Sequence, residues 1–342
     1  MIFEPWYQSE LTENEYIISS RVRLARNLQN HMFMRKLSTD TAFATVREVE
    51  NTIGKINHDR ATNPLVAQDL RHIDEHVFLE KHVLSPAYVK SDLSKGVFVD
   101  MHQNISIMVN EEDHVRLQVV CPGNNLPQAL TKATELDDVL EEHLDFAFDS
   151  NLGYLTACPT NVGTGLRASF MIHLPCLEKT GMLKGLFPYI ARKGMTLRGL
   201  YGEGTIPMGN IFQLSNQVTL GKGEAQVVKE LSAVAAHIIS QERQVMDKIN
   251  EQRPYYLQDK TSRAYGNLSY GRKMGLHEAM GFLSDIRLGI VADFYDLPKP
   301  DAPIYNIMME IQPGHLQQAA DDKLTEHEIH FARADYLRKI FN

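Results

Sequence analysis

The chain has few of the features that mark the simplest functional classes. It contains only three cysteines, Cys121, Cys158 and Cys176, too few for a disulfide framework, which is typical of a reducing compartment. No apolar run approaches the roughly 20 residues that span a bilayer, and the first residues form no basic-then-apolar leader. No histidine pair or Cys-x-x-Cys has metal-ligand spacing. We therefore expect a cytoplasmic protein that does not bind membranes and has no metal site built from its own side chains.

Charge and length narrow the classes further. The 342 residues carry 35 Lys and Arg against 43 Asp and Glu, a formal net charge of -8. This balance disfavours non-specific binding to nucleic acid, although a local basic cluster could still bind phosphate. The hydrophobic content of 43% is ordinary for a globular protein, and the length allows two domains.

Hydrophobic periodicity divides the chain into a mixed part and a helical part. Before residue 240 the pattern predicts short strands and intervening helices, with strands at 15–19, 105–109, 115–120, 169–174 and 195–201 and helices at 41–56 and 128–146. Helical patterns follow at 224–249, 276–287, 306–312 and 326–340. The prediction is an α+β fold: an antiparallel sheet flanked by helices in a catalytic domain, residues 1–240, followed by a helical C-terminal domain, residues 241–342.

The most informative side chains are five arginines in segments that resemble strands or tight turns: Arg21, Arg23, Arg116, Arg167 and Arg198. Arg21 and Arg23 are two apart, a spacing that puts both on one face of a strand. Neighbouring guanidiniums repel each other unless a polyanion lies between them, and their planar fork suits phosphate oxygens. Since no Walker-type Gly-Lys loop is present, the set indicates a polyphosphate clamp. Taken alone, Arg21 and Arg23 could equally be solvated on a surface strand.

Carboxylates and a cysteine accompany the arginines. The turn 110–114, Asn-Glu-Glu-Asp-His, could grip a guanidinium through a carboxylate and take its proton, or be an ordinary solvated turn. In the Gly-rich turn 158–165, Cys158 could be a thiolate beside Arg167 or a small buried apolar residue. The loop 198–205 carries Glu203 and could close over a substrate or be an ordinary Gly-rich loop.

His82 is a weaker candidate, because a lone histidine is more often a satisfied core or surface residue than a group that stacks on a nucleotide base.

Together these segments resemble the phosphagen (guanidino) kinase family. The family's Ser-x-Arg-x-Arg is met at 19–23, its Asn-Glu-Glu-Asp-His hairpin at 110–114 and its Cys-Pro-(Ser/Thr)-Asn-x-Gly-Thr turn at 158–164. The family's Arg-Gly loop is met by Arg198 with Glu203. Four matches in order are far more specific than one, and they imply the glutamine-synthetase-like catalytic fold of that family.

Within the family the chain is most similar to the bacterial protein-arginine kinases. Only 18 residues precede Ser19, so we expect the chain to lack the small N-terminal domain of creatine and arginine kinases. The site should then be open enough for an arginine side chain on a protein. The stretches 204–221, 283–289 and 312–318 add to this resemblance, which covers essentially the whole chain.

The resemblance implies a role for each candidate residue. Ser20 and the five arginines would hold ATP, with His82 at the adenine, and Mg²⁺ would sit on phosphate oxygens and water. Glu112 would be the catalytic base, Glu203 a second carboxylate, and Cys158 a thiol that tunes the guanidinium without covalent chemistry. The reaction would be in-line phosphoryl transfer to arginine in proteins.

The resemblance also implies partners. These are protein substrates with exposed arginine, a Clp protease, a repressor of stress genes and a zinc-binding activator protein, with a homodimer as the assembly. Two other functions remain open. One is a kinase for free arginine or another small guanidino compound, which the short N-terminal segment disfavours. The other is a non-catalytic adaptor for a protease, which the complete set of arginines and glutamates disfavours.

Two parts of the sequence depart from the family pattern. The protein-arginine kinases often carry Arg-Asp-x-x-Arg-Ala near the C-terminus, a pocket for phosphoarginine, whereas this chain has Ile329 and His330 before Arg333 and Ala334. We therefore do not expect control by phosphoarginine. Met171 stands where the small-substrate kinases have a histidine against the adenine, so His82 is the candidate for that contact.

Overall fold

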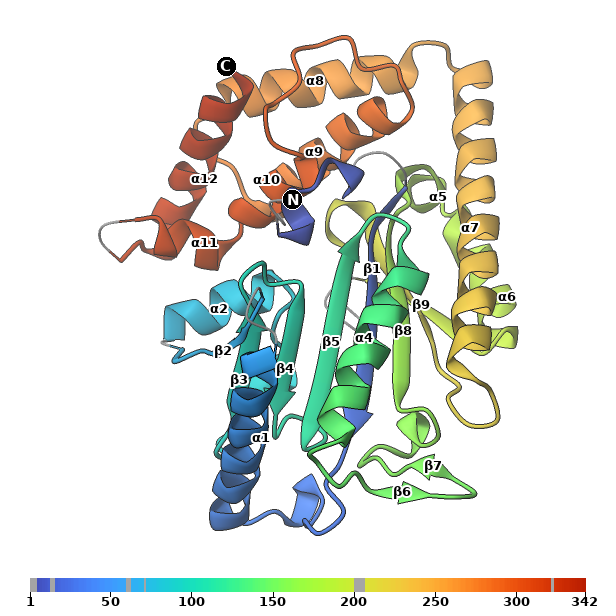
Figure 1. Cartoon of the computed structure of the whole chain (residues 1–342). Coiled ribbons are helices and arrows are strands. Elements are labelled where there is room, and N and C mark those ends of the chain that lie inside the picture. The colour runs from blue at the N-terminus through green and yellow to red at the C-terminus, as the bar shows by residue number, and fades with distance from the viewer. Residues whose placement is uncertain (1–4, 13–15, 60–62, 71, 200–206, 321–322) are drawn as a thin grey trace.

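An eight-stranded antiparallel sheet forms the centre of the molecule (Figure 1). The computed structural model describes residues 5–12, 16–59, 63–70, 72–199, 207–320 and 323–342. In spatial order the strands are β2 (Leu65–Ala67), β3 (Gly96–Asp100), β4 (Ile105–Val109), β5 (Val115–Pro122), β1 (Ile17–Arg26), β8 (Leu166–His173), β10 (Ile211–Asn216) and β9 (Met195–Gly199). A separate hairpin joins β6 (Phe148–Asp149) to β7 (Gly153–Tyr154).

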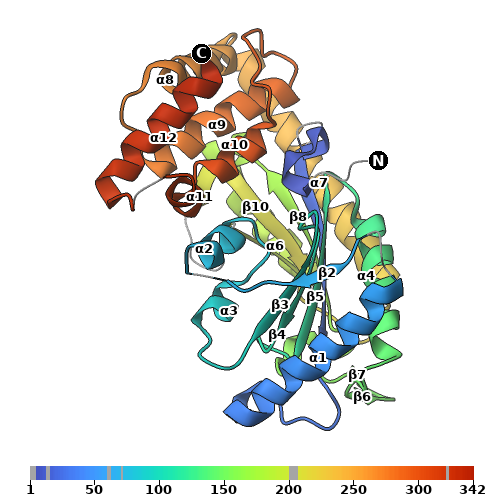
Figure 2. The same cartoon turned by 60° about the vertical axis from the view of Figure 1, so that its left-hand side comes forward.

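Alternation along the strands separates the two faces of the sheet. On β1, Val22 and Leu24 are buried in the largest hydrophobic cluster, so Arg21 and Arg23 face the opposite side. Figure 2 shows three long helices covering the apolar side: α1 (Thr39–Asp59), α4 (Leu126–Glu141) and α7 (Glu224–Gln252). α4 packs on β1 and β5, while α7 packs on β8 and β10. The arginines therefore lie on the face that these helices leave open.

The segment between β2 and β3 covers part of that second face. It contains α2 (His72–Glu80) and α3 (Pro86–Lys90). Its residues Val83, Leu84 and Tyr88 form a small cluster with Val97 and Met108 of the outer strands. Two short helices, α5 (Pro175–Lys179) and α6 (Phe187–Arg192), connect β8 to β9. The open part of the sheet is thus bounded on one side by α2 and α3.

The remaining helices pack against one end of the sheet. They are α8 (Tyr256–Tyr270), α9 (Leu276–Val291), α10 (Ile304–Glu310), α11 (Pro313–Gln318) and α12 (Glu326–Phe341). Their core continues into the sheet, because it includes Ile18, Val120 and Met171 together with Trp6 near the N-terminus. Across the described ranges, the longest helices are too polar to serve as bilayer-spanning segments.

Sequence periodicity located the helices α1, α4, α7, α9, α10 and α12 and the strands β1, β4, β5, β8 and β9, but not the other elements of the fold. The helical pattern gave no signal for α8, and the predicted strand at 15–19 runs on through Arg26, so that Arg21 and Arg23 lie inside β1. The expected division at residue 240 lies within α7, which continues unbroken from Glu224 to Gln252.

A buried ion pair fastens the sheet to its covering helix. The Arg26 Nη2 at the end of β1 lies 2.5 Å from Asp137 Oδ2 on α4, and their side chains are 1% and 6% exposed. The same guanidinium donates to the carbonyl oxygen of Thr164 at 3.0 Å and lies 3.5 Å from the ring centroid of Tyr154. Arg26 therefore also holds the turn that begins at Cys158 in place against β1.

Removing one partner of this pair should be costly, because it leaves a charge buried without its counter-ion. We expect Asp137→Ala to lower the free energy of unfolding by about 3–5 kcal/mol in chemical denaturation. The neighbouring exposed Asp138→Ala is the matched control and should change stability little. The double variant Arg26→Met/Asp137→Ala should recover part of the loss. Equal stabilities of the two single variants would contradict this account.

Candidate active site

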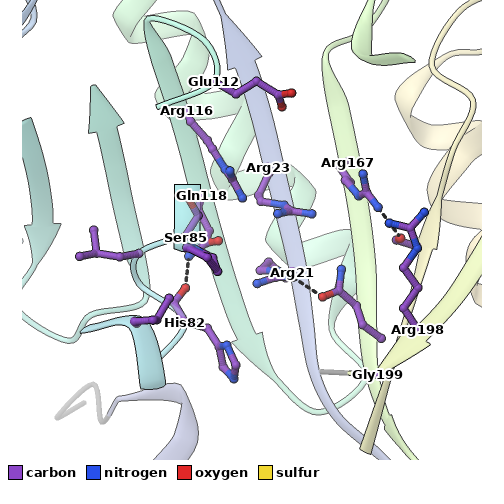
Figure 3. Close-up of a pocket in the computed structure, with 15 residues that line it drawn as sticks. Arg21, Arg23, His82, Ser85, Glu112, Arg116, Gln118, Arg167, Arg198 and Gly199 are labelled. Atoms are coloured by element: carbon purple, nitrogen blue, oxygen red, sulfur yellow. Dashed lines mark hydrogen bonds between the residues drawn. The ribbon is translucent and has the colours of Figure 1, made fainter. Parts of the chain in front are cut away.

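The structure brings the five predicted arginines into one cavity of about 300 Å³. They come from four strands that lie close together in the sheet: Arg21 and Arg23 from β1, Arg116 from β5, Arg167 from β8 and Arg198 from β9. The register pairs Arg23 directly with Arg167. Figure 3 shows the guanidiniums pointing into the same space, with Glu112 at one end and His82 at the other.

Arg21 and Arg167 each donate a guanidinium hydrogen bond to a side chain on β10. Arg21 Nη2 donates to Gln213 Oε1 at 2.6 Å, and Arg167 Nη2 donates to Ser215 Oγ at 3.3 Å. The buried Nε atoms of Arg23 and Arg167 have no hydrogen-bond partner among the described residues. Buried donors of this kind are normally satisfied, so they indicate a missing acceptor in the cavity.

The crowding of positive charge is expressed in the pKa values. Burial lowers the pKa of Arg21 to about 9, with the charges of Arg116 and Arg167 adding to the effect. Burial, and then Arg21, Arg116 and Arg167, hold the pKa of Arg23 well below its usual value. Because guanidiniums keep their protons at neutral pH, these shifts express an electrostatic strain that a bound polyanion would relieve.

The three carboxylates of the acidic turn, those of Glu111, Glu112 and Asp113, lie in different environments. Arg116 Nη1 lies 2.5 Å from Glu111 Oε1, which also accepts a hydrogen bond from Ser85 at 2.5 Å. Burial alone would raise the pKa of Glu111, but the charge of Arg116 and these hydrogen bonds outweigh it and lower the pKa. Asp113 is buried under the turn, whereas Glu112 is exposed and lines the cavity. Glu112 is therefore the carboxylate of this turn that is available to a ligand.

His82 lies at the opposite end of the cavity beside the apolar residues Leu79, Leu84 and Pro86. Its Nε2 is 3.2 Å from the hydroxyl oxygen of Tyr305, and its carbonyl oxygen accepts a hydrogen bond from Gln118 at 2.7 Å. Burial, with the charge of Arg21 as a second cause, lowers the pKa of His82 to about 3. A neutral imidazole next to aliphatic side chains can pack against a flat apolar group.

Ser20, for which the resemblance implies nucleotide binding, is not among the residues that line the cavity. Ser20 is fully buried on the face of β1 opposite to Arg21. Its Oγ donates to the carbonyl oxygen of Gly123 at 2.7 Å and accepts a hydrogen bond from the Asn125 N–H at 2.8 Å. Ser20 therefore joins β1 to the segment before α4.

Cys158 and Glu203 are the two remaining predicted residues, and the structure describes only Cys158. Cys158 is half-buried beside the acidic turn, and its Sγ lies 3.1 Å from Thr160 Oγ1. It is not among the residues that line the cavity. Glu203 lies outside the described residues. The sequence-based set also lacked Gln118, Gln213 and Ser215, which line the cavity and lie on strands at period-two positions.

The structure also places Arg333, the retained arginine of the C-terminal motif, and Met171 on β8. Arg333 is buried, and its guanidinium donates to the carbonyl oxygens of Ile311 at 2.9 Å and Met274 at 3.1 Å. Met171 is 7% exposed and packs in the cluster of the C-terminal helices. Both side chains therefore contribute to packing within the chain.

Two family models match the chain in succession. The model described as ATP:guanido phosphotransferase, C-terminal catalytic domain, matches residues 44–245. The model described as Protein-arginine kinase McsB C-terminal domain matches residues 254–342.

Curated relatives match over nearly the whole chain. The protein-arginine kinase of Halothermothrix orenii is 39% identical over 338 residues, covering 98% of this chain and 96% of that protein. The protein-arginine kinase of Moorella thermoacetica is 40% identical over 339 residues, again covering 98% and 96%.

Solved structures share the fold. A lombricine kinase superposes with a TM-score of 0.60 and 21% identity, covering 74% of this chain and 75% of that chain. The duplicated taurocyamine kinase from Schistosoma mansoni, with bound transition state analog components, has a TM-score of 0.62 and 22% identity, covering 92% and 48%. At these identities the likeness shows the fold alone, and it confirms the predicted antiparallel α+β architecture.

Mutual repulsion among the arginines predicts opposite effects on stability and on ligand binding. Arg23→Met should raise the melting temperature of the free protein, because it removes one of several like charges that lie close together in the cavity. It should also weaken binding of inorganic tripolyphosphate roughly tenfold or more, since charge-assisted hydrogen bonds contribute about 1.5–3 kcal/mol. Calorimetry and thermal unfolding measure both quantities. The exposed Arg47→Met is the control; a destabilised Arg23→Met with unchanged affinity would contradict the clamp.

Proposed function

The chain belongs to the ATP:guanido phosphotransferase family, and within it to the protein-arginine kinases; we therefore propose that it transfers the γ-phosphoryl group of ATP to arginine residues in proteins. One observation carries this proposal most directly. The arginines occupy the middle of the cavity, between the apolar end at His82 and the carboxylate end at Glu112 (Figure 3). This order matches a nucleotide base, a polyphosphate and an acceptor guanidinium laid end to end.

The arginines would carry the electrostatic part of the reaction. As the phosphoryl group moves, negative charge spreads over its oxygens and the leaving ADP oxygen. Guanidiniums held on rigid strands are already oriented toward that charge, so little reorganisation accompanies the transfer. Arg21 and Arg23 lie on β1, Arg167 is paired across from Arg23, and all three line the cavity.

Glu112 would act on the acceptor. A protonated guanidinium is a poor nucleophile, so a proton must leave the attacking nitrogen as its bond to phosphorus forms and the bond from phosphorus to the ADP oxygen breaks. Glu112 is the exposed carboxylate at the cavity and would bind the guanidinium and accept this proton. We propose Cys158 as a thiol near the same guanidinium, and Glu203 as a second carboxylate.

Magnesium would enter with the nucleotide. Within the described ranges, no three carboxylate, histidine or cysteine side chains gather closely enough to hold a metal ion. Mg²⁺ keeps several waters and commonly binds through substrate phosphates, so we propose that phosphate oxygens and water hold it here. Its contribution would be to neutralise phosphate charge alongside the arginines.

The family resemblance supports further proposals on the cellular setting. We propose a cytoplasmic homodimer that marks proteins for a Clp protease and depends on a zinc-binding activator protein. Control by phosphoarginine is not part of this proposal. Ile329 and His330 replace the family's Arg-Asp pair, and the remaining Arg333 uses its guanidinium to hold Ile311 and Met274.

Replacing the proposed base separates catalysis from binding. Glu112→Gln keeps the shape of the side chain but cannot accept the proton, so phosphotransfer should fall by about 10²–10⁴-fold while ATP still binds. Acid-labile phosphate on an unfolded model protein measures the transfer. The exposed Glu135→Gln on α4 is the matched control and should keep full activity. Full transfer by Glu112→Gln would remove Glu112 from the role of base.

The acceptor class needs its own assay. The wild-type protein should form phosphoarginine on the unfolded protein with ATP and Mg²⁺, and form little on free arginine. The reverse preference would make this a kinase for a small guanidino compound. Transfer to neither acceptor, with the activator present, would contradict the kinase assignment and favour a non-catalytic adaptor.

A further inference from the structure

Asn27 is the first residue after β1, and it is buried where the acidic turn and the cysteine turn meet. Its Nδ2 donates to Asp113 Oδ1 at 2.6 Å and to the carbonyl oxygen of Leu155 at 3.1 Å. Its Oδ1 accepts the backbone N–H of His114 at 2.9 Å. The side-chain amide of Asn27 therefore uses both its donor hydrogens and its acceptor oxygen. These hydrogen bonds join the end of β1 to two turns that are distant in sequence.

Asp113 extends this connection to the residue before Cys158. The same Oδ1 atom that faces Asn27 accepts the backbone N–H of Ala157 at 2.6 Å. Asp113 is 2% exposed and forms its hydrogen bonds with neutral donors. Burial raises its pKa to about 6, although the hydrogen bonds from Ala157 and Asn27 oppose the shift. Burying this carboxylate is unfavourable. Its hydrogen bonds to Asn27 and Ala157 therefore indicate that Asp113 has a structural role in the turn.

His114 closes the network on the other side of the turn. Its Nδ1 accepts the N–H of Leu28 at 3.1 Å, and its Nε2 lies 2.9 Å from the carbonyl oxygen of Met32. This pattern fits the neutral imidazole with its proton on Nε2. Burial lowers the pKa of His114 to about 4, which keeps the ring neutral. The segment after β1 is thus bonded to the turn through three consecutive contacts of Asn27 and Leu28.

The catalytic carboxylate itself lacks such support. Glu112 is exposed, and the described residues offer its side chain no hydrogen bond. Its location therefore depends on its neighbours. Glu111 is held by Arg116 and Ser85 on one side, and Asp113 is held by Asn27 on the other. Loss of the second support would let Glu112 shift relative to the arginines of β1.

We propose that Asn27 is a positioning residue that fixes Glu112 and the Cys158 turn relative to the arginine strand β1. The proposal rests on the function proposed above, since it assigns Asn27 the task of holding the acceptor guanidinium in line with the phosphoryl group. Asn27 is not among the residues that line the cavity. Its effect should therefore appear in kcat and leave the binding of ATP, which depends on the arginines, unchanged.

The first test compares Asn27→Ala with Asn57→Ala. Asn57 is the control because its side chain also bonds backbone in both directions, to the N–H and carbonyl oxygen of Leu65, but between α1 and β2. Asn27→Ala should lose about 100-fold in kcat, the effect of a misplacement of about 1 Å, with the KM for ATP unchanged. Asn57→Ala should keep its kcat. Loss of activity in both variants in proportion to their melting temperatures would overturn the proposal.

A charge swap tests the same contact without leaving a cavity. Asn27→Asp places a second carboxylate against Asp113 and should reduce kcat at least as much as Asn27→Ala. Adding Asp113→Asn removes the repulsion between the two carboxylates, because the amide of residue 113 can turn its Nδ2 toward the carboxylate of residue 27. Recovery should be partial, since in the wild-type protein one oxygen, Asp113 Oδ1, accepts from both Asn27 and Ala157. The double variant should recover part of the lost kcat. No recovery in a folded double variant would mean that the contact does not position Glu112.

Hydrogen–deuterium exchange separates this inference from the proposed function, because it needs no turnover. In Asn27→Ala, exchange should speed up in the peptides around 110–116 and 153–160, while Asn57→Ala should leave both unchanged. If exchange responds in this way but the wild-type protein phosphorylates no arginine, the network stands and the proposed function fails. If the wild-type protein is active and exchange does not respond, the positioning role fails.

Discussion

The structure depends on one electrostatic constraint: several guanidiniums are held close together on one face of a sheet that cannot spread apart. Arg23 and Arg167 are paired across neighbouring strands, and the pKa values of Arg21 and Arg23 are lowered mainly by burial and further by like charge. In the free protein this arrangement is unfavourable, and the apolar core beneath the other face offsets it. The free energy that a bound polyanion recovers there is available for binding and for stabilising transferred charge.

Two kinds of interaction fix the positions of the side chains around the cavity. The arginines lie within strands, so the backbone ladder fixes their spacing without help from other side chains. The acidic and cysteine turns have no such ladder at their tips and are held by side-chain hydrogen bonds instead, through Glu111, Asp113 and Asn27. Strand pairing thus holds the arginines of the cavity in place, and buried polar contacts in the turns hold the part of the cavity around Glu112.

The sequence predicted those features of the structure that depend on a local residue pattern. The period of two correctly put Arg21 and Arg23 on one face, and the same rule argues against Ser20, which lies one position away and faces α4. The helix α8 was missed because its buried stripe contains Thr261 and Ala264, which give little hydrophobic signal. The contact between Asn27 and Asp113 spans 86 positions, and no spacing rule reaches that far.

The antiparallel register of β1 has a consequence for how this chain can change in evolution. A single residue inserted near the start of β1 would turn every later side chain of the strand to the other face. Val22 and Leu24 would then project into the cavity, while the guanidiniums of Arg21 and Arg23 would enter the core beneath α4. A substitution in this strand changes one side chain on one face. An insertion or deletion changes the hydrophobic core and the cavity at the same time. The strand should therefore keep its length even where its sequence drifts.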